Sequence, residues 1–246
     1  MKSHICLLVC IFVLGLFVSP VATRSIDITN DLAAYYPLNG STEDQSGNSN
    51  HADLVGPVWG MNMCARPDSA LQFYTQGHSY MIAATKPLSP IPGEIEALTL
   101  AAWIFPTRLD DTRIIVDKFN PTSQDREFRF ALQDGQLRFI WATVDRDGAH
   151  DGFDIIEGNK TLEPGQWHHV AASYQRGKAR LFVNGKEIAS KATEDWPIYE
   201  ANAKLQVGGN GYGLDGFFNG KIDELRIYTR ALEKYDIQAL AARPCQ

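Results

Sequence analysis

The segment between residues 166 and 190 constrains the fold of this chain more than any other segment. Residues 167–174 are rich in aromatic and β-branched side chains, which favours a strand, and a short turn follows them. Residues 179–183 form a second expected strand, which ends at Asn184-Gly185. Asn and Gly tolerate the positive φ that both central residues of a type I′ turn need, so residues 186–190 should fold back as a third strand. The sequence therefore predicts a three-stranded antiparallel meander.

Short strand-like segments separated by turn residues recur along the rest of the chain. Residues 98–105 are apolar on both faces, as in a central strand that is buried on both sides. Residues 128–132 alternate apolar side chains with Arg129 and Ala131, and we expect the charges around this segment on an exposed face. Further expected strands are residues 32–38, 51–59, 70–74, 80–83, 113–119, 137–144, 205–207 and 220–228. Residues 145–154 are expected to be an acidic loop.

This pattern specifies a fold class. Many short strands at regular spacing predict an all-β protein, a two-sheet antiparallel jelly-roll sandwich. Ile237, Leu240 and Ala241 have helical spacing, so a short C-terminal helix is expected. The chain has 246 residues and no repeat or linker, which favours one domain over residues 26–246.

Three segments resemble a known family. They are residues 167–185, residues 220–232 and the loop Asp44-Gln45-Ser46-Gly47-Asn48-Ser49-Asn50. In this order they resemble the laminin-G-like, concanavalin A-like jelly-roll domains. The resemblance implies that the first and last strands are neighbours. The family includes lectins, adhesion modules, pentraxin-like proteins and glycosidases, so the resemblance alone does not select a function.

The N-terminus predicts export. Residues 1–22 resemble a secretory signal peptide, with Lys2 at the start and an apolar run over residues 5–18; cleavage as late as Ser25 is the other candidate. This run is short for a membrane span, which needs about 20 residues, and no later segment is suited to span a membrane. The formal charge of −6, or −7 without Lys2, argues against a nucleic-acid partner, which favours a basic face. A glycan or an extracellular protein is the expected partner.

Without the signal segment the chain keeps Cys64 and Cys245. Two thiols in an exported protein suggest one disulfide between them. Asn39 and Asn159 begin acceptor sequons in expected loops, which predicts N-glycosylation if the source is eukaryotic.

The loop from Asp44 to Asn50 is the candidate calcium site. Ca²⁺ takes six to eight oxygen ligands, and this loop offers side-chain oxygens with Gly47 between them. The neighbouring first and last strands of the family would bring Asp223 close to the loop. The candidate ligands are Asp44, Ser46, Asn48, Asn50 and Asp223. The alternative is that these residues are turn formers, each with its own local hydrogen bonds.

Aromatic residues in loops are the candidate carbohydrate platform, because a sugar ring has an apolar face that stacks on an aromatic side chain. The candidates are Trp59, Trp196, Tyr199 and Tyr212. The alternative is that they cover the edge of the core. His168 and His169 are adjacent on a strand and point to opposite faces, so they cannot both bind one metal ion.

The sequence favours binding over catalysis. A retaining glycosidase needs two carboxyl groups about 5 Å apart, and the Glu-x-Asp-x-x-Glu motif of the related glucanases does not occur in this chain. A secreted, non-catalytic module that binds carbohydrate is therefore the first hypothesis. An adhesive or structural matrix protein is the alternative, and a glycoside hydrolase or polysaccharide lyase is a further one.

Overall fold

The computed structural model describes residues 27–83, 94–121, 123, 125–144, 150–213 and 216–243. The predicted signal segment, Cys245 and the first half of the predicted acidic loop lie outside these residues.

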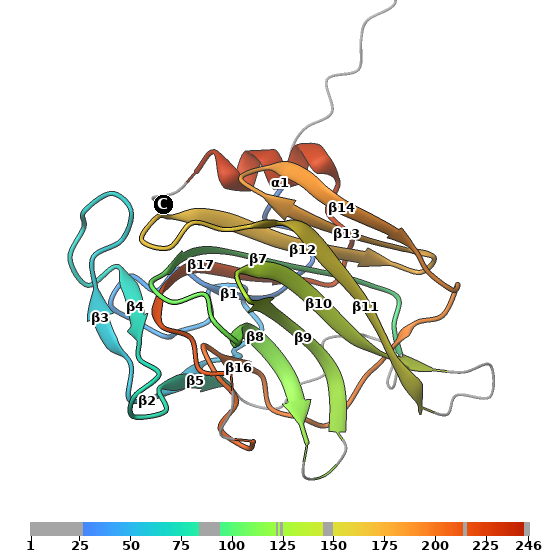
Figure 1. Ribbon diagram of the computed structural model, residues 1–246, viewed down its shortest axis with the longest axis horizontal. Coiled ribbons are helices and arrows are strands. Elements are labelled where there is room, and N and C mark those ends of the chain that lie inside the picture. The colour runs from blue at the N-terminus through green and yellow to red at the C-terminus, as the bar shows by residue number, and fades with distance from the viewer. Residues whose placement is uncertain are drawn as a thin grey trace, which may run out of the picture.

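Two antiparallel sheets face each other in the described part of the chain (Figure 1). Sheet A contains, in spatial order, β14 (Lys186–Ala192), β13 (Lys178–Val183), β12 (His168–Gln175), β7 (Ala97–Pro106), β17 (Gly220–Tyr228), β4 (Ala70–Phe73) and β3 (Val58–Gly60), and β1 (Leu32–Tyr36) pairs with β17. Sheet B contains β2 (Ala52–Val55), β5 (Tyr80–Ala83), β16 (Gln206–Val207), β8 (Thr112–Asn120), β9 (Asp125–Gln133), β10 (Gln136–Val144), β15 (Ile198–Tyr199) and β6 (Glu94–Ile95), and β11 (His150–Thr161) pairs with β10. The predicted two-sheet sandwich is confirmed, and it is consistent with a jelly roll.

The meander has the predicted turn. Asn184 and Gly185 have φ of 49° and 74°, and Val183 pairs with Lys186 across the turn. The positive φ at both central residues is the type I′ geometry that links β13 to β14.

Apolar side chains fill the space between the sheets. They include Leu100, Ala102 and Ile104 of β7 and Leu137, Phe139 and Trp141 of β10. Each set occupies alternate positions of its strand, so it lies on one face and the intervening residues lie on the other.

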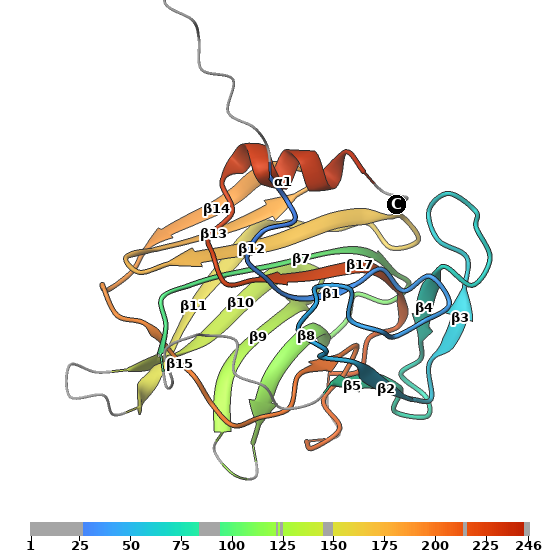
Figure 2. The same cartoon turned by 180° about the vertical axis from the view of Figure 1, so that it is seen from behind.

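The outer face of sheet A is covered by helix α1 (Lys234–Ala241). Ala101, Ala171 and Phe182 pair in register across three strands, and they pack with Ile237 and Leu240 in a second apolar cluster. In both views the helix lies over β12, β13 and β14, on the side away from sheet B (Figures 1 and 2). The predicted C-terminal helix is therefore confirmed. No helix among the described residues is long and apolar enough to span a bilayer.

The first and last strands are neighbours, as the resemblance implies. Tyr35 of β1 pairs with Arg226 of β17, and Tyr36 pairs with Leu225. Strand β17 is also flanked by β7 and β4, so the last strand lies inside sheet A.

Two expected elements differ from the structure. Residues 51–59 form two strands in different sheets, because Gly56, with φ of 83°, turns the chain between β2 and β3. The predicted loop of residues 145–154 is wrong in its second half, since β11 begins at His150 and pairs with β10 from Val144 to Gln136.

The charges around β9 are buried or half-buried, contrary to the prediction of an exposed face. Glu127 is fully buried, and its Oε2 accepts a 2.5 Å hydrogen bond from Lys118 Nζ. The backbone N–H of Ala201 donates to the same oxygen at 3.0 Å. Arg129 pairs with the buried carboxylate of Asp117 at 3.0 Å. A buried charge needs a partner of opposite sign, so these ion pairs replace the expected contact with water.

Candidate functional site

An aromatic cavity of about 230 Å³ lies between the ends of β10, β11 and β12 and the segment after β14. It is lined by Trp141, Thr143, Phe153, Asp154, Tyr174, Thr193, Glu194 and Trp196. Trp141 and Tyr174 belong to the core between the sheets, so the cavity is an opening at one end of the sandwich. We refer to it as the aromatic cavity.

Ring contacts and one hydrogen bond fix the aromatic wall. The rings of Trp141 and Tyr174 lie 5.3 Å apart between centroids and are tilted by 49°. Tyr174 donates its hydroxyl hydrogen to the carbonyl oxygen of Trp196 at 2.5 Å, which holds the backbone of Trp196 at the wall. Burial raises the pKa of Tyr174 to about 12, so the phenol stays protonated at neutral pH and keeps this hydrogen bond.

The polar side of the cavity joins the two sheets. Lys191 of β14 donates to the Asp154 carboxylate and, at 2.9 Å, to the carbonyl oxygen of Ile155 on β11. Its ammonium group also lies 5.9 Å from the centre of the Trp141 ring. The charge of Asp154 is therefore paired, and the hydroxyls of Thr143 and Thr193 and the carboxylate of Glu194 complete the polar part of the lining.

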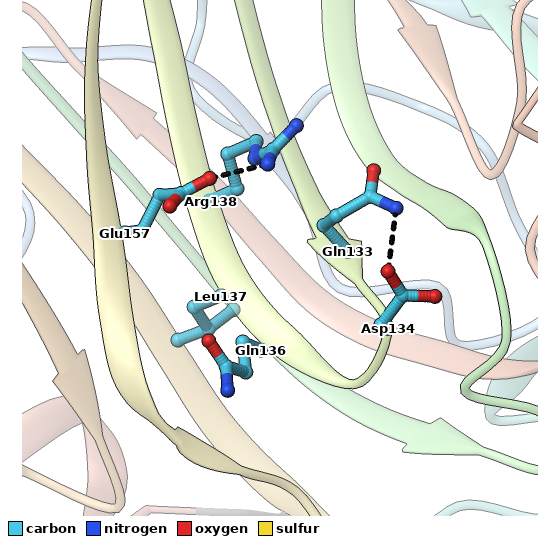
Figure 3. Close-up of a pocket in the computed structure, with 6 residues that line it drawn as sticks. All are labelled: Gln133, Asp134, Gln136, Leu137, Arg138 and Glu157. Carbon is cyan, nitrogen blue, oxygen red and sulfur yellow. Dashed lines mark hydrogen bonds and ion pairs between the residues drawn. The ribbon is translucent and has the colours of Figure 1, made fainter.

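A second cavity of about 240 Å³ lies at the other end of β10, and we refer to it as the polar cavity. Its lining residues are Gln133, Asp134, Gln136, Leu137, Arg138 and Glu157 (Figure 3). Figure 3 shows two pairs, Arg138 with Glu157 and Gln133 with Asp134, and Gln136 stands apart from both. The lining consists mostly of amide and charged side chains.

A family model, the concanavalin A-like lectin/glucanases superfamily, matches residues 75–238. The chain belongs to this superfamily. The predicted family resemblance is therefore confirmed over most of the two sheets.

Two solved structures are similar in fold to this lectin/glucanase-type domain. Domain 4 of an extracellular arabinanase from Geobacillus stearothermophilus, in complex with arabinotriose, has a TM-score of 0.64 and 22% identity, with 86% of this chain and 98% of that chain covered. The ligand-binding domain of botulinum neurotoxin serotype D, in complex with N-acetylneuraminic acid, has a TM-score of 0.67 and 14% identity, with 87% and 51% covered. At these identities the likeness establishes the fold alone.

Among curated proteins, the domain is similar to pappalysin-1 of Mus musculus. The two are 24% identical over 184 residues, which is 70% of this chain and 11% of that protein. The chain thus corresponds to about a tenth of that relative.

The four predicted platform aromatics do not lie together. Trp196 lines the aromatic cavity, and Tyr199 belongs to β15, whose Ile198 pairs with Thr143 of the same cavity. Trp59 packs on the core from β3 of sheet A. The backbone N–H of Tyr212 donates to Asn210 Oδ1 within the glycine-rich loop that follows β16.

Sequence reasoning missed three aromatic side chains of the cavity. Trp141 and Tyr174 lie within predicted strands, where large apolar side chains indicate core positions. Phe153 stands in a stretch that resembles a loop. These side chains come together because β11 approaches β14 in the folded protein. No local sequence pattern indicates this approach.

The front loop is held by hydrogen bonds to β1. Asp44 Oδ1 accepts from the backbone N–H of Tyr35 and of Ser46, each at 2.9 Å. Its Oδ2 accepts from Ser46 Oγ at 2.8 Å and from the Asn50 N–H at 2.9 Å. The side-chain amides of Asn48 and Asn50 donate to the carbonyl oxygens of Leu32 and Ala33.

The donors of this loop saturate the Asp44 carboxylate, whereas the buried Oδ1 of Asn50 has no hydrogen-bond partner among the described residues. An ionised carboxylate has about four lone-pair positions, and all of these on Asp44 are directed at N–H or O–H donors. The described residues also contain no group of three or more His, Cys, Asp or Glu side chains that could hold a metal ion. Calcium binding at this loop stays a prediction from the sequence.

Asp223 lies in a row of buried polar side chains on sheet A. It pairs in register with Trp103, and Trp103 pairs with His169. Trp103 Nε1 and His169 Nδ1 are buried and have no hydrogen-bond partner among the described residues, and the two rings meet edge to face at 5.5 Å. The carboxylate of Asp223 accepts from the Glu224 N–H at 2.8 Å. Burial, followed by the charge of Glu224, raises the pKa of Asp223 to about 8.

The structure describes one cysteine of the predicted disulfide and both predicted glycosylation sites. Cys64 is disulfide-bonded, and its predicted partner Cys245 lies outside the described residues. Asn39 and Asn159 are both exposed. Asn159 belongs to strand β11, so the prediction that it lies in a loop is wrong. Their glycosylation stays a prediction.

Proposed function

We propose that this domain is a secreted, non-catalytic module that binds carbohydrate in the aromatic cavity. The observation that carries the proposal is the composition of the cavity wall. The accessible rings of Trp196 and Phe153 stand beside hydroxyl and carboxylate groups in a space of about 230 Å³, which the buried Trp141 and Tyr174 also line. Aromatic faces stack on the apolar face of a sugar, and convergent polar groups orient its hydroxyls.

The structural neighbours support the proposal at the level of the fold. Both the arabinanase domain and the neurotoxin domain were determined with a carbohydrate bound. The predicted signal peptide and the disulfide-bonded Cys64 support an extracellular location.

A glycan array probed with the intact protein and with Trp196→Ala tests the proposal. Trp196 lines the cavity, so we expect its truncation to weaken binding by about tenfold through the loss of aromatic stacking. Trp59→Ala is the matched control, because Trp59 is also partly exposed but lies on β3. Equal binding by the intact protein and both variants would place the carbohydrate elsewhere, and the absence of binding to any glycan would remove the proposal.

An adhesive role is the second candidate, and an exposed apolar surface favours it. Val58, Met61 and Met63 are 49%, 54% and 44% exposed around β3. Apolar groups exposed together mark protein interaction sites in many soluble proteins. Elution from a polysaccharide column by free sugar indicates a lectin, whereas retention in the insoluble matrix fraction indicates an adhesive protein.

Hydrolysis is the less favoured candidate. Asp154 and Glu194 line the same cavity, and glycosidases use a pair of carboxyl groups. The ion pair of Asp154 with Lys191 occupies one of the two carboxylates. Release of reducing ends from a bound oligosaccharide, and its loss in Glu194→Gln, would establish catalysis.

A further inference from the structure

An arginine on the outer face of sheet B has an open guanidinium group. Arg126 of β9 is half-buried, and its Cζ atom lies 5.2 Å from the centre of the Phe119 ring and 5.6 Å from that of the Phe153 ring. Among the described residues, no hydrogen bond or ion pair reaches this guanidinium, and its buried Nε atom has no partner. A guanidinium has five N–H donors, so Arg126 offers hydrogen bonds that the described residues do not accept.

A β-bulge turns Arg126 to the outer face. Arg126 and Phe128 would share a face in a regular strand, and Phe128 packs in the core. The register shifts between Lys118 and Phe119, however, and Arg126 pairs with Phe119. Glu127 is the extra residue of β9, and Arg126 therefore lies beside Phe119 on the face away from the core.

Two phenylalanine rings hold the guanidinium in place. Phe119 belongs to β8 and Phe153 to β11, and β9 and β10 lie between these strands. Three strand spacings of about 4.8 Å would separate their backbones by about 14 Å, yet the two rings lie 5.8 Å apart between centroids. The rings therefore lean toward each other over the sheet, and Ala142, which pairs with Phe153 on this face, is fully buried. A guanidinium held between two rings loses little conformational freedom when it binds a ligand.

The charge of Arg126 has no carboxylate partner in the described part of the chain. Asp125 precedes it in β9 and accepts a hydrogen bond from Ser123. Other charged side chains of this face are matched in ion pairs, Arg129 with Asp117 and Arg138 with Glu157. An anionic group is therefore favoured next to the two rings.

The surroundings of Arg126 suit an acidic saccharide. A planar guanidinium binds the oxygens of a carboxylate or a sulfate ester through paired N–H donors. Phe153 and Ile155 lie on the same face of β11 and are 41% and 37% exposed, so they offer apolar surface to the face of a sugar ring. A peptide partner commonly pairs with a free strand edge, whereas β8, β9 and β10 are each paired on both sides. A ligand that is recognised through side chains is therefore favoured.

We propose that this face of sheet B binds an acidic saccharide, with its anionic group on Arg126 and its ring against Phe153 and Ile155. Trp141 alternates with Ala142 on β10, so the core wall of the aromatic cavity lies on the opposite face of the sheet. The inference thus adds a second site, which borders the aromatic cavity at Phe153 and does not rest on the proposed function.

Matched pairs of charged and neutral ligands test this site. Trigalacturonate is compared with its methyl ester, and a sulfated galactan trisaccharide is compared with its desulfated form, by isothermal titration calorimetry with the intact protein. We expect the charged member of at least one pair to bind about tenfold more tightly, because a hydrogen bond to a charged group is stronger than one between neutral groups. The pair that shows the difference distinguishes a carboxylate from a sulfate ester.

Arg126→Gln removes the charge, and we expect it to abolish the preference for the charged ligand and to leave binding of the neutral ligand unchanged. Arg66→Gln is the matched control, because Arg66 is exposed on the loop between β3 and β4 and its substitution changes the net charge equally. Arg126→Lys retains the charge without the planar group, so most of the preference should be lost in this variant as well. If Arg126→Gln melts at a lower temperature than the natural protein, Arg126→Lys provides the test.

Three outcomes would overturn the inference. They are equal affinities within both pairs, an equal loss in Arg126→Gln and Arg66→Gln, and tighter binding of a glutamate-rich peptide of the same charge, which would assign this face to a protein partner. Trp196→Ala separates the inference from the proposed function. If acidic saccharides bind through Arg126 while no glycan depends on Trp196, the proposed function fails and this site stands. In the reverse case, the proposed function stands and this site fails.

Discussion

Two buried carboxyl groups, Asp44 and Asp223, have opposite electrostatic surroundings. Burial pushes the pKa of Asp44 upward, but hydrogen bonds from Tyr35, Asn50 and Ser46 together hold it below the usual range. Burial, followed by the charge of Glu224, raises the pKa of Asp223 to about 8, because its carboxylate accepts only one such bond, from the Glu224 N–H, to oppose the rise. The first carboxyl group favours folding when it is ionised, and the second favours folding when it is protonated.

The hydrogen bonds of Asp44 predict the response to metal removal. Since the donors to both carboxylate oxygens come from the protein itself, the Asp44 carboxylate is satisfied without a cation. We expect EDTA to leave the melting temperature unchanged, measured by differential scanning calorimetry at neutral pH. A lower melting temperature in EDTA that added Ca²⁺ restores would contradict this expectation and support the calcium site predicted from the sequence.

Asp223 predicts a pH dependence of stability. The unfolded chain ionises this carboxyl group near pH 4, whereas the folded protein does so near pH 8. Between these values the folded state binds more protons, so the free energy of unfolding falls with rising pH, by at most about 1.4 kcal/mol per pH unit for this group. Asp223→Asn removes this contribution to the free energy of unfolding. The free energy of unfolding of the variant minus that of the natural protein should therefore rise steadily between these two pH values.

Urea unfolding of both proteins at several pH values measures this difference. The comparison cancels the contribution of His169, whose pKa burial lowers to about 3 and whose stabilising effect is lost as pH falls below its unfolded value. It also cancels that of Glu127, whose pKa burial raises to about 7. A stability difference that does not vary with pH would show that Asp223 ionises normally in the folded protein.

At the scale of the element, strand β17 depends on the close approach of its first residue to β7. Gly220 has φ of 138°, and a Cβ atom there would lie 2.0 Å from the backbone carbonyl oxygen of Phe105. The contact is with backbone, so a rotamer change cannot relieve it. We expect Gly220→Ala to lose more than about 4 kcal/mol of stability or to prevent folding, as judged by urea denaturation or soluble yield.

Gly177→Ala is the matched control for Gly220→Ala. Gly177 also has a positive φ, 81°, but no atom of the described residues lies within 4 Å of its ideal Cβ position. Its substitution should cost only the left-handed backbone penalty, about 1–2 kcal/mol. Similar losses in the two variants would mean that the contact with Phe105 is unimportant.

The sequence predicts those elements whose signals are local. Asn184-Gly185 specifies its own turn, and the apolar run of β7 indicates a central strand, so both were predictable. Strand β11 is different, because its first half has the composition of a loop and pairing with β10 makes it a strand. Pairing between distant segments also explains the buried charges, since Lys118 and Glu127 pair with each other and both form hydrogen bonds with the backbone of Ala201.

The candidate site was predictable only in part for the same reason. Trp196 was identified because it is an aromatic residue in a loop. Trp141 and Tyr174 combine a core position with a cavity wall, and a sequence pattern indicates only the first. The cavity depends on how two sheets meet at their ends, and this geometry is set by the whole sandwich.

At the scale of the molecule, strand pairing, a hydrogen bond and apolar packing connect the two ends of the described chain. Strand β1 pairs with β17, and Tyr228 Oη donates to the carbonyl oxygen of Ile28 at 2.9 Å. Ile28 also packs in the apolar cluster beneath α1. The N-terminal and C-terminal segments therefore complete the outer face of sheet A together, so the sandwich cannot be finished until both are in place.

A disulfide from Cys64 to Cys245 would reinforce this closure, and it predicts the effect of reduction. Cross-linking distant residues restricts the unfolded chain, so the bond should stabilise the protein by about 2–4 kcal/mol. We expect Cys64→Ser, Cys245→Ser and the double variant to lose the same amount in urea denaturation. A reducing agent should lower the melting temperature of the natural protein by a matching amount and leave the variants unchanged. If Cys245→Ser kept full stability while Cys64→Ser lost it, Cys64 would have a different partner, and the C-terminus would be held by strand pairing and the packing of α1 alone.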